Sequence, residues 1–128
     1  MASITTSRAG AALLAATGFI HAVLVPEYLR EEAYIGVLFI LGAISCAALA
    51  VLLWVRGDAL AWGAGAAVCA GMGVGFVLSR TVGLPGFHES EWDLSGMVSL
   101  ALEGAFIALA ASTVAGSRKL VGPGNAQA

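Results

Sequence analysis

Three ionisable side chains lie inside or at the end of apolar stretches, and these residues could do chemistry. His21 lies within the apolar run 9–25, and Glu103 lies within the run 96–115. Arg80 ends a third apolar run. Because an ionisable side chain in an apolar span is costly, it usually faces the interior of a helix bundle and has a partner there. His21, Glu103 and Arg80 are therefore the first candidates for a site.

A polar stripe accompanies the carboxyl of Glu103. Ser95, Ser99 and Glu103 repeat every four residues, so they share one face of a helix. In one interpretation, Glu103 pairs with Arg80 or His21 and fixes the register of the helices, a structural role that buried ion pairs can have. In the other, His21 and Glu103 face a small outward pocket as ligands or proton-handling groups.

A metal site is a second kind of chemistry that these residue types allow. The segment 79–95 carries a histidine among acids, namely His88, Glu89, Glu91 and Asp93. Imidazole nitrogen and carboxylate oxygen can ligate zinc or copper, so His21, His88 and Glu103 are candidate ligands, with Arg80 supporting an anion. The spacing is not a metal signature, and an acidic loop is more often simply solvated.

The two cysteines, Cys46 and Cys69, lie inside apolar runs and predict no disulfide framework. If the chain folds back at the short connection 56–58, the two cysteines lie at matching depths in the membrane, where a thiol pair could bind Cu(I). Buried cysteine is more often a small apolar filler, and we favour that interpretation.

Four long apolar segments must position these residues. Apolar residues make up 59% of the chain and charged residues 11%, whereas a soluble domain carries about 25% charged residues. A helix that crosses the hydrocarbon core needs about 20 mostly apolar residues. The segments that meet this requirement are 7–25, 34–55, 59–78 and 96–115. We predict an all-α integral membrane four-helix bundle, antiparallel and up-down, as one domain over residues 1–121 with a disordered cytoplasmic tail at 122–128.

The ends of the segments carry proline, tryptophan and charge. Pro26 is expected to stop the first helix, and Trp54, Trp62 and Trp92 are expected to be interfacial anchors. Basic residues are unevenly divided, with Arg8, Arg56, Arg118 and Lys119 on one side against Arg30 and Arg80 on the other. By the positive-inside rule, both termini are predicted to lie in the cytoplasm.

The third segment is rich in glycine. Gly71 and Gly75 form a small-xxx-small pair, which lets helix backbones approach closely. We expect tight helix packing inside the bundle at this pair. A homodimer face, or a groove that admits a ligand, is the alternative.

Two motifs follow the first and third segments: Pro26-Glu27 and Ser79-Arg80-Thr81-Val82-Gly83-Leu84-Pro85. Together with His21, Gly36, Phe39, Glu91 and Glu103, they resemble a family of small four-span membrane proteins of actinobacteria and related bacteria, over nearly the whole chain. The resemblance implies a bacterial cytoplasmic membrane location and a site of His21, Glu27 and Arg80 near the outer face. It supplies no substrate. Where members have a histidine after Pro-Glu, this chain has Tyr28, which weakens the metal hypothesis.

These observations favour a binding or accessory subunit of a larger membrane assembly, in contact with lipid and with other copies or partners. The sequence shows no nucleophile–base pair, nucleotide loop or pair of haem histidines across helices, so we do not predict an enzyme, although one acting on a lipid or quinone is left open. The basic residues are too few and scattered for nucleic acid. The alternatives are an outward-facing metal- or small-ligand-binding site, and an oligomeric transporter or channel.

Overall fold

The computed structural model describes residues 2–120, with side chains through Gly116. It contains four helices, α1 (Ile4–Glu31), α2 (Ala33–Val55), α3 (Ala59–Arg80) and α4 (Leu94–Leu120). Each is long and apolar enough to cross a membrane. The chain is therefore an all-α, multi-pass membrane protein, and all four predicted segments are confirmed. The predicted tail at 122–128 lies outside the described residues.

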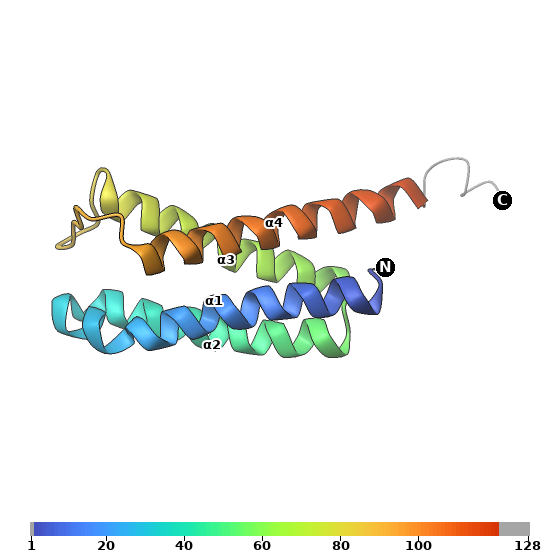
Figure 1. The fold of residues 1–128 in the computed structure, drawn as a ribbon, viewed down its shortest axis with the longest axis horizontal. Helices are drawn as coiled ribbons and strands as arrows, with labels where there is room; N and C mark the ends of the chain where they lie inside the picture. The colour runs from blue at the N-terminus through green and yellow to red at the C-terminus, as the bar shows by residue number, and fades with distance from the viewer. Residues whose placement is uncertain (1, 121–128) are drawn as a thin grey trace.

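The helices pack pairwise as an antiparallel bundle (Figure 1). α1 and α2 lie side by side along their whole length, and α3 and α4 form the other half of the molecule. The N-terminus and the end of α4 lie at one end of the bundle, where α2 also turns into α3. The α1–α2 turn and the α3–α4 connection lie at the opposite end, which we call the loop end. The candidate site is at the loop end.

Local capping explains where α3 begins. Gly57 adopts a positive φ of 61°, which glycine tolerates without a steric penalty, and this turns the chain after α2. Asp58 then caps α3 by accepting a hydrogen bond from the Ala61 N–H at 3.0 Å. This bond, together with the guanidinium of Arg56 at 2.7 Å, holds the pKa of Asp58 below its usual value.

The prediction that Pro26 stops the first helix is wrong, because α1 continues through it to Glu31. A proline inside a helix removes one backbone hydrogen bond. The turn beyond it is held by packing instead. The ring of Tyr28 stacks on Phe39 of α2, with centroids 4.3 Å apart, and meets the edge of Phe87 at 5.8 Å.

The core at the end opposite the loop end is built around Trp62. Its ring is fully buried and stacks on Phe106 of α4, with centroids 5.4 Å apart. Gly10 makes room for it, since a Cβ there would lie 2.6 Å from the indole. The prediction of Trp62 as an interfacial anchor is therefore wrong, whereas Trp54 and Trp92 are exposed. A tryptophan near a segment end anchors only if it faces lipid, and Trp62 faces α1 and α4.

Glycine allows close helix contact at positions other than the predicted pair. A Cβ on Gly18 would lie 2.9 Å from the Cβ of Cys46, and one on Gly65 would lie 2.7 Å from the ring of Phe106. At Gly71 and Gly75 a Cβ would meet nothing within 4 Å. Tight packing inside the bundle at that pair is thus absent from the described chain, because the two glycines face open space.

The two cysteines fill the core. Cys46 and Cys69 are free, buried and part of one apolar cluster that also holds Leu14, Leu53 and Trp62. This environment is the one expected for small apolar fillers.

Candidate functional site: a cavity at the loop end

A cavity of about 300 Å³ lies between the helices towards the loop end. Its apolar walls come mainly from α2 and α3 and include Ile35, Leu38, Phe39, Val68, Met72 and Phe76. The polar side chains that line it are His21, Tyr28, Ser79, Arg80, Ser99 and Glu103. A largely apolar cavity with a few convergent polar groups is typical of a small-molecule site.

His21 presents one ring nitrogen to this cavity. The residue is buried on α1, and its Nδ1 lies 2.9 Å from the carbonyl oxygen of Thr17. Because a carbonyl can only accept, we assign the proton to Nδ1, which makes Nε2 an acceptor in the neutral ring. Phe39 packs against the ring, with centroids 4.8 Å apart. Nε2 has no hydrogen-bond partner among the described residues.

Glu103 on α4 is buried with one carboxyl oxygen bonded. The Ser99 hydroxyl donates to Oε2 at 2.7 Å, and Oε1 would lie 3.4 Å from a Cβ on Gly73. Among the side chains described, through Gly116, no cation pairs with this carboxyl, and Oε1 has no hydrogen bond. The prediction that Glu103 pairs with Arg80 or His21 is therefore wrong. All three residues line the same cavity, but Arg80 has another partner.

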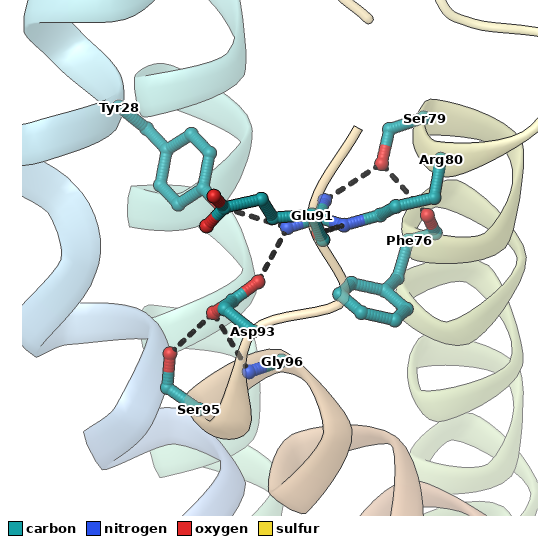
Figure 2. Close-up of polar contacts among 8 residues, drawn as sticks. All are labelled: Tyr28, Phe76, Ser79, Arg80, Glu91, Asp93, Ser95 and Gly96. Atoms are coloured by element: carbon teal, nitrogen blue, oxygen red, sulfur yellow. Dashed lines mark hydrogen bonds and ion pairs between the residues drawn. The ribbon is translucent and has the colours of Figure 1, made fainter. Parts of the chain in front are cut away.

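Arg80 fastens the α3–α4 connection to the end of the helices (Figure 2). Its guanidinium donates to Asp93 Oδ1 at 2.7 Å, the Glu91 carbonyl at 3.1 Å, the Ser79 hydroxyl at 2.8 Å and the Tyr28 hydroxyl at 3.3 Å, and it lies over the Phe76 ring at 4.1 Å. These contacts join α3 to α1 and to the loop. The arginine is thus a structural anchor whose charge is matched by Asp93.

Asp93 connects this anchor to the start of α4, a role that sequence reasoning missed. Its Oδ2 accepts from the Ser95 hydroxyl at 2.7 Å and from the Gly96 N–H at 3.1 Å. Burial raises the pKa of Asp93, but the hydrogen bonds from Ser95, Arg80 and the Gly96 N–H outweigh burial and hold the pKa below its usual value. An aspartate just before an apolar segment is a helix N-cap signal, which could have revealed this role.

The α3–α4 connection covers the loop end of the cavity. Leu84 and Phe87 line the cavity and pack against Tyr28 and Ile35. The Tyr34 hydroxyl donates to the Pro85 carbonyl, which ties the same loop to α2. The turn needs glycine, since Gly83 and Gly86 have φ values of 86° and 67°.

Two predicted site residues lie away from the cavity. Glu27 is exposed on α1, and His88 is exposed on the loop. The structure therefore does not bring His21, His88 and Glu103 together. Over the part of the chain that is described, no three His, Cys, Asp or Glu side chains lie close enough together to hold a metal ion.

Comparison with known proteins adds no family. No family model matches the chain, and no curated protein or solved structure matches it. The fold and the site define its class as a four-helix, multi-pass membrane protein with a cavity between its helices. The resemblance to a family of small four-span proteins stays a prediction.

Proposed function

We propose that this protein binds a small amphipathic molecule dissolved in the membrane, held in the cavity at the loop end. The supporting observation is that His21 and Glu103, both more than nine-tenths buried as residues, line one apolar cavity with Nε2 and Oε1 free of hydrogen bonds. Both atoms are accessible from the cavity, since the fully buried side-chain atoms without a partner in the described chain are Thr17 Oγ1 and Trp62 Nε1. A ligand head group would therefore bond both atoms. The apolar part of the ligand would lie along α2 and α3.

The arrangement of the walls supports access from the lipid side. The α3–α4 connection covers the loop end, so the ligand would pass between α2 and α3. There Leu38 is 54% exposed, and Gly71 and Gly75 leave open space beside the cavity. This use of the glycine pair matches the groove that the sequence offered as an alternative.

We place this cavity in the outer half of the bacterial cytoplasmic membrane, with both termini inside, on the charge bias and the resemblance. The interpretations as an accessory subunit or as an oligomeric transporter stay predictions of the sequence.

Filling the groove tests the proposal. Protein in lipid nanodiscs is photolabelled with an alkyl diazirine that carries a terminal hydroxyl, and labelled residues are located by peptide mass spectrometry. We expect label on cavity residues of α2 and α3, lost in the double variant Gly71→Leu/Gly75→Leu. Both positions have room for a side chain, so the fold should tolerate the change.

Gly104→Leu is the matched control, because Gly104 also has open space around it but does not line the cavity. It should leave the labelling unchanged. The proposal fails if only lipid-facing residues are labelled, or if cavity residues are still labelled in the Gly71→Leu/Gly75→Leu variant. Either result would show that the cavity does not bind the probe.

A further inference from the structure

We infer that the cavity selects head groups that donate hydrogen bonds, such as a hydroxyl or an ammonium, over head groups that only accept them. This inference rests on the proposed function and names the chemical class of its ligand. It follows from which atoms of the cavity wall are already bonded.

The deep part of the cavity offers only acceptors. The Nδ1 proton of His21 is used by the Thr17 carbonyl, so the free Nε2 of the neutral ring accepts. Glu103 in its carboxylate form accepts through the free Oε1, while Oε2 already accepts from the Ser99 hydroxyl. A head group that bears only carbonyl or ether oxygens would leave both atoms unsatisfied.

The donors of the wall are already used or lie elsewhere. Ser79 donates to the Phe76 carbonyl at 2.7 Å. Arg80 points its guanidinium at the loop and at Asp93. The Tyr28 hydroxyl accepts from Arg80, and Tyr28 lies two helical turns, or about 10 Å along the α1 axis, from His21. A ligand head beside His21 and Glu103 therefore meets acceptors.

The chemistry allows two sources of the donor, which the probe series separates. Both a hydroxyl and an ammonium can donate, and only the ammonium also brings a positive charge to Glu103. Charge-assisted hydrogen bonds are about twice as strong as neutral ones. A preference for the ammonium over the hydroxyl would therefore show that the charge of the carboxylate adds to binding, and equal binding would show that hydrogen bonding alone contributes.

The experiment uses three alkyl diazirines that differ only in the head group: hydroxyl, primary ammonium and methyl ether. In wild-type protein we expect cavity labelling by the hydroxyl or ammonium probe to exceed that by the ether about tenfold, as one or two hydrogen bonds allow. Equal labelling by all three, or preference for the ether, would overturn the inference. If the cavity is labelled without head-group preference and this labelling is lost in Gly71→Leu/Gly75→Leu, the proposed binding site stands although the selectivity does not. If no probe labels the cavity, both proposals fail.

Two variants at the head-group site sharpen the result. Glu103→Gln keeps an oxygen for Ser99 and turns an N–H₂ group to the cavity, so the ether probe should gain and the ammonium probe should lose. Ser99→Ala frees Oε2 as a further acceptor and should increase the preference for donors. Unchanged selectivity in both folded variants would show that Glu103 does not contact the head group.

Discussion

Arg80 shows how one buried charge can organise a loop without taking part in a site. Its side chain is buried, and its contacts join α3 to α1 and to the α3–α4 connection. Removing one partner of a buried pair is costly, because the other charge is left uncompensated. Glu103, by contrast, has no compensating charge among the side chains of residues 2–116. The two residues therefore have separate roles, although both line one cavity.

The pairing of Asp93 with Arg80 predicts a dependence of stability on pH. Because the folded pKa of Asp93 is lowered, its contribution is present above the unfolded value of about 3.9 and is lost as pH falls through the folded pKa. We expect Asp93→Asn to reduce the free energy of unfolding by about 1–2 kcal/mol at pH 7, a value reduced for its partial exposure. The difference between the two proteins should shrink as the pH falls below about 4, towards the lowered folded pKa of Asp93.

Thermal unfolding of the wild-type and Asp93→Asn proteins in nanodiscs measures this effect. The pH is varied from about 3 to about 7, a range that includes the usual aspartate pKa. Glu91→Gln is the control, because Arg80 contacts the backbone carbonyl of Glu91 and not its side chain. A deficit in Asp93→Asn that is the same at every pH would show that the carboxylate charge is not what stabilises the loop.

At the scale of the helices, glycine has opposite effects at different positions. A Cβ on Gly18 would press against Cys46 between α1 and α2, whereas one on Gly71 would meet nothing. We expect Gly18→Ala to cost about 1–3 kcal/mol, as overpacking does. Gly71→Ala should be neutral or should stabilise by about 0.5–1 kcal/mol, since alanine is the better helix former. Thermal unfolding of the two variants distinguishes these effects, and equal destabilisation by both would contradict the packing described.

The existence of the helices could be predicted from the sequence, but their contacts could not. Long apolar runs require helices in lipid, so all four spans were predicted. The passage of α1 through Pro26 depends on Tyr28 packing against other elements, which local rules do not contain. Trp62 was misassigned because depth in a span does not reveal which face of the helix carries a residue.

The unknown direction of each side chain also limits what the sequence predicts of the candidate site. A polar residue in an apolar run is a strong signal, and it identified His21 and Glu103. Their similar depth suggested an ion pair with Arg80, yet pairing also depends on the direction in which each side chain points. Asp93 was missed as the partner of Arg80 because it was grouped with the acids of the loop.

At the scale of the whole molecule, the two ends of the bundle are built differently. Trp62, Phe106, Leu14 and Leu53 fill the end opposite the loop end and leave no exposed surface on their side chains. The loop end instead contains the cavity, closed by a connection that depends on polar contacts. Binding sites commonly lie where packing is less complete, so the molecule divides into a packed half and a half suited to a ligand.

This division makes the orientation of the bundle decisive for the source of the ligand. The bias of basic residues predicts that the α2–α3 turn lies in the cytoplasm and the loop end lies outside. We expect His88→Cys to react with a membrane-impermeant maleimide in intact bacterial cells, because position 88 is exposed on the loop. We expect Ala59→Cys to react only after the cells are permeabilised, because position 59 is exposed at the start of α3, at the opposite end of the bundle. Cys46 and Cys69 are buried, so the parent protein should give little background. The reverse pattern would place the cavity in the inner half of the membrane and would restrict its ligands to those of the cytoplasmic leaflet.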